Sequence, residues 1–492
     1  MDIRKRNFIG SVRESELPIV PTAFQGQQNL GRGKGQCLNH VSEEGKRGDC
    51  TMLETPEKIR ELQRKLYQKA KQEKEFRFYL LYDKVYRVDI LNYAYRLVRA
   101  NKGAAGVDGI TFESIEEREG RSQKYLEGVV EELKCKTYKP MPVRRVYVPK
   151  PDGSKRPLGI PTVKDRIVQM AVKIVIEPIF EADFQENSYG FRPKRDAHQA
   201  VDDVSYHLRH GKFQVIDADI SKYFDTIPHD KLLALVSKRI VDKNILRLIK
   251  LWLKAPVVEE DKDKKTYKGN DKGTPQGGVI SPLLANIYLN VLDTTWKLKK
   301  VEERLEARLI RYADDFVVLC KGNMEKVLKG MKKILGGLQL SLNEEKTRVV
   351  DARNESFNFL GFTIKVAESP RTGKKFPLIV PSKKAMRDIK AEIKTLTCRK
   401  NLALPKEVVV NNLNEIVRGW VNYFYYGHCS NDLLRLKRFL DERVRTYLRR
   451  KHRMKSRGYK AFSYRYLYED IGLYKIPSTV PWTRTAKASG RR

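Results

Sequence analysis

Three carboxylates lie where predicted strands begin or end. Asp314 and Asp315 occur in LIRYADDFVVL (309–319), a pattern typical of a β-hairpin with the acids at its tip. Asp219 comes near the end of KFQVIDADI (212–220), whose apolar content favours a strand in a covered sheet. If these strands are neighbours, the three acids meet, and oxygen ligands of this kind suit Mg²⁺. The pattern predicts two-metal phosphoryl transfer, although an Asp-Asp pair in a turn is also common on solvated surfaces.

The elements that would position these acids alternate between helices and strands. Residues 55–101 show mainly helical spacing, and from about residue 140 short strands, turns and helices follow one another. RRVYVPK predicts a strand, and PDGSK the tight turn after it. We therefore expect an α+β domain over residues 55–376.

A different composition begins near residue 377 and predicts an all-helical domain to residue 475. Pro381-Ser382 is a helix start signal, and two further helices are expected at 408–424 and 431–453. The third helix places one apolar stripe inward: Leu436, Phe439, Leu440, Val444, Tyr447 and Leu448. Its end carries a basic cluster, predicted to bind RNA phosphates, although a solvated face is the alternative: Arg449, Arg450, Lys451 and Arg453.

Net charge is the outlier in the composition. The 492 residues include 98 Lys and Arg against 61 Asp and Glu, a formal charge of +37. So basic a chain favours a polyanionic partner over a charged surface with no specific partner, because neutralised phosphates release counterions. Six scattered cysteines without a Cys-x-x-Cys pair favour a reduced, intracellular protein. No apolar run approaches the ~18 residues of a membrane span, so we expect no membrane partner.

The two ends of the chain differ from the rest. Residues 1–54 are polar and Gly-rich, and we interpret them as an N-terminal extension with the composition of a disordered segment rather than a signal peptide. Residues 476–492 form a basic tail.

Several blocks in a fixed order carry a family resemblance. RYADDFVVL and DADISKYFDTIPHDKL resemble the two catalytic segments of reverse transcriptases, and GTPQGGVISPLLANIYLN resembles the block whose Gln lies over the incoming nucleotide. LQLSLNEEKT resembles the segment with the active-site Lys, and FNFLGF the primer grip. NKGAAGVDGIT, RPLGIPTVKDRIVQ, SYGFRPKRDAHQAV and IVRGWVNYFYYG resemble the finger and maturase segments of group II intron reverse transcriptase/maturases.

The resemblance covers about residues 85 to 475 and implies a right-hand polymerase with fingers, palm and a helical thumb that is also the maturase domain. It implies an RNA-directed DNA polymerase that binds its group II intron RNA, promotes splicing and copies the intron into DNA. The implied partners are that RNA, a template–primer duplex, target DNA and deoxynucleoside triphosphates, in a ribonucleoprotein of the bacterial cytoplasm or nucleoid.

Catalytic roles follow from the matched positions. The resemblance implies that Asp219, Asp314 and Asp315 hold two Mg²⁺ ions, for which Mn²⁺ could substitute, with the Ile220 carbonyl as an added ligand. Lys346 could protonate the pyrophosphate leaving group, and the alternative is a solvated lysine.

Nucleotide-binding roles follow in the same way, each beside a plainer alternative. Lys150 and Arg156 would clamp the triphosphate. Alternatively, Lys150 is an ordinary loop lysine and Arg156 pairs with a surface acid. Phe224 would exclude a ribose 2′-hydroxyl, or be core. Gln276 would lie by the incoming sugar or base, between residues whose glycines permit close approach. For Trp420, Tyr423 and Phe424, helical spacing favours core over base stacking.

Two other functions remain in competition with the bifunctional protein. One is a maturase with an inactive polymerase, against which the intact carboxylates argue. The other is a reverse transcriptase of another system, such as phage defence or CRISPR adaptation, against which GWVNYF and the basic helices argue. No Cys-rich HNH endonuclease follows the maturase segment, so we expect priming by existing strands, such as nascent strands at a replication fork.

Overall fold

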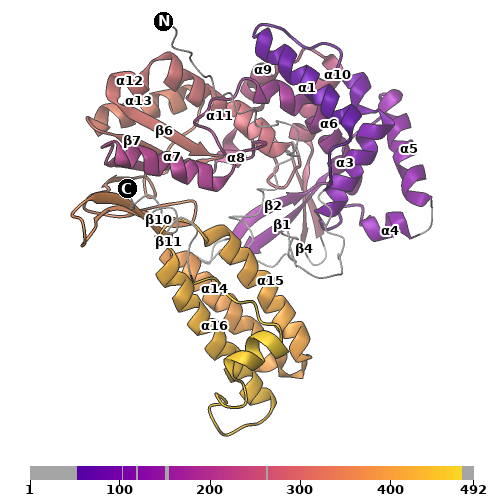
Figure 1. Ribbon diagram of the computed structural model, residues 1–492. Helices are drawn as coiled ribbons and strands as arrows, with labels where there is room; N and C mark the ends of the chain where they lie inside the picture. The colour runs from indigo at the N-terminus through magenta and orange to yellow at the C-terminus, as the bar shows by residue number, and fades with distance from the viewer. Residues whose placement is uncertain (1–52, 102, 118–119, 150–154, 262–263, 479–492) are drawn as a thin grey trace, which may run out of the picture.

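The computed structural model describes residues 53–101, 103–117, 120–149, 155–261 and 264–478. Residues 1–52 of the expected extension, residues 479–492 of the expected tail and most of the expected PDGSK turn lie outside these ranges. Figure 1 shows a broad body of helices and sheets from which a narrower bundle of helices projects.

A buried helix organises the N-terminal half of the body. Helix α6 (Val163–Glu181) is buried on nearly every side, and most of its buried residues are apolar, as expected for a helix inside a core. Helices α1 (Glu57–Gln72), α2 (Tyr82–Val85) and α3 (Val88–Ala100) pack against it. The other helices before the bundle are α4 (Phe112–Glu116), α5 (Arg121–Lys134), α7 (Ala197–Arg209), α8 (Tyr223–Thr226), α9 (His229–Ser237), α10 (Lys243–Lys254), α11 (Ser281–Leu298), α12 (Val301–Leu305) and α13 (Met324–Gly337).

Three sheets lie in the body. The outer sheet has the order β2-β1-β4-β5, with β1 (Val143–Pro149), β2 (Lys155–Ile160), β4 (Val257–Asp261) and β5 (Lys264–Lys268). The central sheet has the order β6-β7-β3-β8, with β3 (Gln214–Asp219), β6 (Ala307–Tyr312), β7 (Asp315–Cys320) and β8 (Arg348–Asp351). The small sheet has the order β11-β10-β9, with β9 (Phe357–Phe359), β10 (Phe362–Glu368) and β11 (Lys375–Pro381).

The central sheet confirms the strand at 212–220 and the hairpin at 309–319. Strands β6 and β7 pair antiparallel from Ala307 opposite Cys320 to Tyr312 opposite Asp315, and β3 pairs with the other edge of β7. One face of the sheet joins the large core around α6, and the other packs on α7 and the small sheet. The carboxylates thus stand at the end of a sheet held rigid on both faces.

The small sheet joins the body to the bundle. The domain limit expected between residues 376 and 377 falls inside β11, which pairs with β10 along its whole length. Helix α14 (Lys383–Leu396) begins after Ser382, whose Oγ accepts a hydrogen bond from the Ala385 amide at 3.1 Å, as the start signal predicts.

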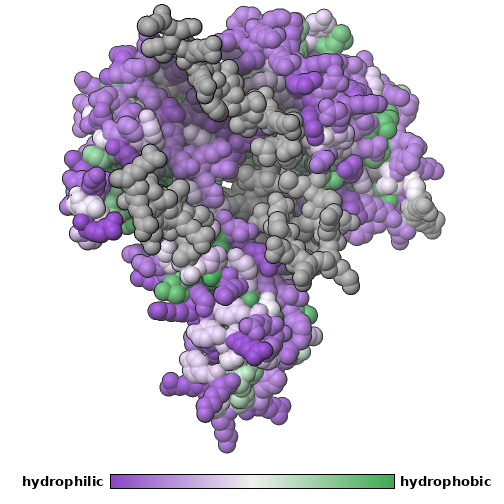
Figure 2. Space-filling view, in the orientation of Figure 1, coloured by the Kyte–Doolittle hydropathy of each residue, from purple (hydrophilic) through white to green (hydrophobic). Residues whose placement is uncertain are grey.

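Helices α15 (Lys406–Phe424) and α16 (Ser430–Lys451) complete the bundle with α14, and two short helical turns, Arg399–Ala403 and Tyr466–Asp470, flank them. The predicted inward stripe of α16 is buried, with Phe439 half-buried at its edge. Figure 2 shows a largely hydrophilic face over both the body and the bundle.

The base of the bundle is bonded to the body at several points. The Tyr423 hydroxyl donates to the Leu360 carbonyl at 2.9 Å, and His198 Nε2 of α7 donates to the Tyr423 carbonyl at 2.7 Å. The His428 amide donates to the Ile379 carbonyl of β11 at 2.7 Å. The last turn of α15 is therefore part of the contact between α7 and the small sheet.

Candidate active site

Antiparallel register brings two of the predicted carboxylates face to face. Asp219, the last residue of β3, lies directly opposite Asp315, the first residue of β7. Side chains opposite each other in such a ladder have Cβ atoms about 4.5–5.5 Å apart. Asp314 precedes Asp315 in the turn, so the structure gathers all three acids at one end of the central sheet.

The turn that carries Asp314 has an unusual backbone. Ala313, the first of its two central residues, has φ of 59° and is buried. A left-handed conformation costs a residue with a Cβ about 1–2 kcal/mol, so surrounding contacts must hold it. Gly190 presses on the turn, because a Cβ at that position would lie 2.3 Å from the Ala313 nitrogen.

Lys346 reaches the carboxylates from a separate loop. Its Nζ lies 3.0 Å from Oδ2 of Asp219, and the two side chains are 64% and 29% exposed. The Asn343 amide donates to the Asp219 carbonyl at 2.8 Å, which fixes this loop beside β3. The lysine is largely solvated, and its ammonium pairs with one of the three candidate metal ligands.

The loop carrying Gln276 lies between the outer sheet and α8. The Gly159 amide of β2 donates to the Gln276 carbonyl at 2.6 Å, and the Thr274 amide donates to the Phe224 carbonyl at 2.7 Å. The Phe224 ring is half-buried against the large core. The structure thus brings Phe224, five residues after Asp219 in the chain, and Gln276 to one neighbourhood.

Some predicted residues are described only in part. Lys150 lies outside the described residues, and Arg156 is described only as a backbone position in β2 opposite Val148. Ile220 follows Asp219, with its side chain buried and its backbone bridged to Leu342.

Burial and charge shift the titration of groups around the acids. Burial raises the pKa of Asp217 to about 6; Arg348 opposes this rise and Asp219 adds to it. Burial, with smaller contributions from Asp196 and Asp315, raises the pKa of Tyr312 to about 12. The site therefore combines a poorly hydrated floor with partly exposed acids at its rim.

The predicted RNA-binding cluster at the end of α16 is divided. Lys451 donates to the carbonyls of Leu402 at 2.8 Å and Leu404 at 2.7 Å, so its ammonium holds the loop before α15. Arg449 and Arg450 are half-buried, and Arg453 is exposed.

The aromatic residues expected in the core of the bundle are found there. Phe424 is buried, and Trp420 and Tyr423 pack partly buried against the core between α7 and the small sheet. This confirms the interpretation as core.

The three aspartates form a donor set for hard divalent cations, since each offers carboxylate oxygens at one sheet end. Within the described ranges, no group of three or more His, Cys, Asp or Glu side chains is already gathered closely enough to hold an ion. Polymerase sites of this type complete the metal shell with substrate phosphates and water, so a partial protein shell fits.

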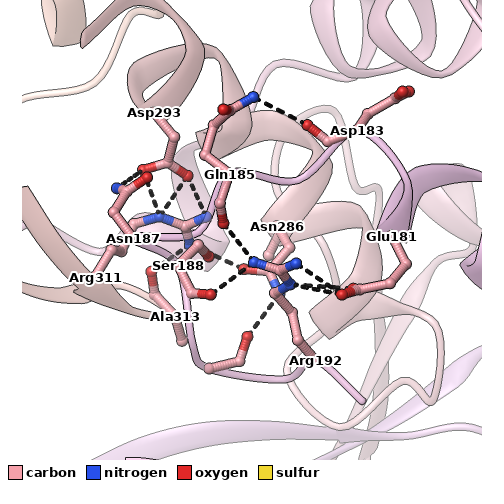
Figure 3. A network of polar contacts seen from close by, with 12 residues as sticks. Glu181, Asp183, Gln185, Asn187, Ser188, Arg192, Asn286, Asp293, Arg311 and Ala313 are labelled. Carbon is pink, nitrogen blue, oxygen red and sulfur yellow. Dashed lines mark hydrogen bonds and ion pairs between the residues drawn. The ribbon is translucent and has the colours of Figure 1, made fainter. Parts of the chain in front are cut away.

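Sequence reasoning missed three residues behind the turn. Arg311 is fully buried and bonded to Asp293 of α11, and Asn286 of the same helix donates to the Gly190 carbonyl (Figure 3). The signal was available for Asn286 and Asp293, because residues seven apart share a helix face, and Asn290 adds a third polar residue to that face of a largely apolar helix.

Comparison with known proteins gives the same order of domains. A family model described as "Reverse transcriptase (RNA-dependent DNA polymerase)" matches residues 148–364. A model described as "Group II intron, maturase-specific domain" matches residues 386–466. The chain therefore carries a reverse transcriptase domain followed by a maturase domain.

Two curated relatives place the chain within that class. Protein YkfC of Escherichia coli K12 is 36% identical over 341 residues, which cover 62% of this chain and 87% of that protein. The group II intron-encoded protein LtrA of Lactococcus lactis subsp. cremoris is 31% identical over 438 residues, covering 72% of this chain and 71% of that protein. The chain belongs to the family of group II intron-encoded reverse transcriptase/maturases, and the prediction of an RNA-directed DNA polymerase with a maturase domain is confirmed.

The family uses divalent metal ions and binds nucleic acid. Among solved structures, a partial Cas6-RT-Cas1–Cas2 complex matches 52% of this chain and 42% of that chain at 24% identity with a TM-score of 0.32. In the described part of the chain, no helix is both long and apolar enough to cross a membrane.

Proposed function

We propose that this chain binds a group II intron RNA, promotes its splicing, and copies it into DNA at a new site from deoxynucleoside triphosphates. The observation that supports this most is the pairing of Asp219 with Asp315 beside the turn that carries Asp314. The maturase-specific domain favours intron RNA over the RNA of another system. We place the activity in a ribonucleoprotein of the bacterial cytoplasm.

In this proposal Asp219, Asp314 and Asp315 hold two Mg²⁺ ions, with the Ile220 carbonyl as a further ligand. The ions supply Lewis-acid activation of the primer 3′-hydroxyl and neutralise charge on the leaving pyrophosphate. The 3′-hydroxyl would lose its proton to solvent, its oxygen would bond to the α-phosphorus, and the bond to pyrophosphate would break. Lys346, already at Asp219, is the candidate donor of a proton to the leaving group.

The incoming nucleotide is proposed to lie against Phe224 and Gln276. Hydrogen bonds from the Gly159 and Thr274 amides fix the backbone at both positions, so the two side chains have a rigid base. The partly exposed ring of Phe224 would meet a 2′-hydroxyl, which gives the preference for deoxynucleotides. Lys150 and Arg156 complete the proposal as clamps of the triphosphate.

RNA binding by the bundle is proposed for Arg449, Arg450 and Arg453. Guanidinium groups at a helix end bind phosphates through charge and paired hydrogen bonds. The ammonium of Lys451 is engaged with two carbonyls, so we assign that residue to the domain's own stability.

Primer extension on an RNA template tests the polymerase site. We would compare the wild type with Asp314→Ala/Asp315→Ala in Mg²⁺ and deoxynucleotides, and measure intron RNA binding for both proteins. We expect extension by the wild type, none by the variant, and equal RNA affinity. A wild type that binds intron RNA tightly without extending a primer would replace this proposal with a maturase that lacks polymerase activity.

RNA affinity as a function of salt tests the basic surface. Arg450→Gln/Arg453→Gln should weaken intron RNA binding and flatten its dependence on salt, because fewer phosphates are neutralised. Lys451→Gln is the matched control and should lower the melting temperature while leaving the salt slope unchanged. The reverse result would refute the assignment.

A further inference from the structure

We propose that Arg311 is a positioning residue for nucleotide addition, acting on the catalytic turn through the Ala313 carbonyl. The inference rests on the proposed roles of Asp314 and Asp315.

Strand alternation places Arg311 on the opposite face of the central sheet from Asp219 and Asp315. It precedes Tyr312, which pairs with Asp315, and its side chain points into the large core with 0% exposure. A guanidinium in that position contacts no solvent and no substrate. Its effect on the reaction must therefore pass through the groups to which it is bonded.

Those groups lead directly to the turn. Nη1 of Arg311 donates to the Ala313 carbonyl at 2.9 Å and to Asn286 Oδ1 at 2.9 Å (Figure 3). Nε and Nη2 donate to the carboxylate of Asp293 at 2.6–3.2 Å. The fork of the guanidinium is thus fixed by α11 while one of its nitrogens holds the residue before Asp314.

The same network fixes the other side of the turn. Asn286 Nδ2 donates to the Gly190 carbonyl at 2.7 Å, and Gly190 lies against the Ala313 nitrogen. The main chain of Arg311 is held as well, because its amide donates to the Asn187 carbonyl and its carbonyl accepts from the Tyr189 amide, both at 2.8 Å. Asn286 therefore joins the two supports, one on each side of Ala313.

The backbone of Ala313 explains why two supports are needed. A positive φ on a residue with a Cβ persists only where its surroundings over-determine it. Asp314 and Asp315 are the next two residues in the chain. A change of the Ala313 backbone to a negative φ would therefore turn both carboxylates away from Asp219. Lysine cannot replace the arginine, because a single ammonium cannot reach Asp293 and the Ala313 carbonyl in one fixed fork.

The test is Arg311→Lys, with Arg239→Lys as its matched control. Arg239 is also buried and bonded to an acid and to backbone carbonyls, but at the contact between α1 and α9, away from the turn. Single-nucleotide addition would be followed over a Mg²⁺ titration at saturating template–primer and deoxynucleotide. Melting temperature and template–primer affinity would be measured for both variants.

We expect Arg311→Lys to raise the half-saturating Mg²⁺ concentration and lower kcat at limiting Mg²⁺ by about 10–100-fold, the range found when supports of metal ligands are changed. High Mg²⁺ should restore part of the rate. Arg239→Lys should keep the wild-type Mg²⁺ curve even if it melts earlier. If Arg311→Lys follows the wild-type curve, or loses activity only in step with melting temperature as Arg239→Lys does, the inference is wrong.

Two further variants keep the result interpretable. Asn286→Ala retains the ion pair and the Ala313 bond but removes the link to Gly190, so it should shift the Mg²⁺ curve in the same direction by less; an unshifted curve would count against the inference. Asp314→Asn should be inactive at every Mg²⁺ concentration. Activity in that variant would overturn the proposed site, whereas an inactive Asp314→Asn beside an unaffected Arg311→Lys would overturn this inference alone.

Discussion

The ion pair between Arg311 and Asp293 gives a stability prediction that can be worked from its geometry. Both side chains are 0% exposed, and three hydrogen bonds join them. Asp293→Leu leaves a guanidinium buried without its counterion, and Arg311→Met leaves a buried carboxylate. Breaking a buried pair in this way destabilises a protein by about 3–5 kcal/mol.

The double variant separates the free energy of the Arg311–Asp293 interaction from the separate contribution of each residue to stability. Arg311→Met/Asp293→Leu buries no unpaired charge, but it orphans the Ala313 carbonyl and the Asn286 oxygen, at about 1–3 kcal/mol for each unsatisfied group. We therefore expect the double variant to be no less stable than either single variant, which implies a coupling free energy of several kcal/mol.

Thermal melting of the four proteins measures this cycle. At about 2–4 °C for each kcal/mol in a domain of this size, each single variant should lower the first melting transition by about 6–20 °C. The double variant should melt at or above the temperature of either single variant. A loss in the double variant equal to the sum of the two single losses would refute the reasoning, because the groups would then act independently.

Three other predictions concern catalysis, selectivity and pH. Lys346→Ala should slow nucleotide addition by about 100- to 10,000-fold if it is the general acid; Lys332→Ala, which breaks another exposed pair with Glu344, should not, and equal rates would contradict the role. Phe224→Ala should raise incorporation of ribonucleotides relative to deoxynucleotides in primer extension, and an unchanged ratio would mean that the ring only packs. Burial raises the pKa of Glu177 above its usual value, so the folded state binds the proton more tightly, and stability should fall as pH rises from the usual pKa to the raised one. In Glu177→Gln this contribution is absent; melting curves from pH 4 upward that keep a constant gap between the two proteins would show that the shift does not exist.

Local patterns were sufficient for the strands and for the position of the acids. Alternating apolar residues predicted the hairpin at 309–319, and the tip of a hairpin can hold only a few residues, so Asp314 and Asp315 had to lie together. The prediction that Asp219 lies close to Asp314 and Asp315 needed one assumption, that its strand is a neighbour of the hairpin. The pairing of β3 with β7 confirms that assumption. The start of α14 followed from the pair Pro381-Ser382.

Contacts between distant segments were beyond reach of such patterns. Arg311 stands between Ile310 and Tyr312 in a strand, where a charged residue ordinarily faces water, and its acid lies on α11. The sequence placed Lys451 in one basic cluster with its neighbouring arginines. It gave no sign that Lys451 bonds to the carbonyls of Leu402 and Leu404, because these lie in a loop some fifty residues earlier. Charge along a sequence shows that a surface is basic, whereas tertiary structure decides which cations remain available to a ligand.

The bonds at the base of the bundle link two surfaces that we propose to contact nucleic acid. Tyr423 of α15 donates to Leu360, in the segment that resembles the primer grip, and accepts from His198 of the body. A change in the orientation of the bundle on binding RNA would therefore change the position of the strands expected to bind the primer end. Such coupling is reciprocal. Primer binding would therefore increase the affinity for RNA by the same free energy by which RNA binding increases the affinity for the primer. The intron would then serve as an activator of its own copying, as well as the template.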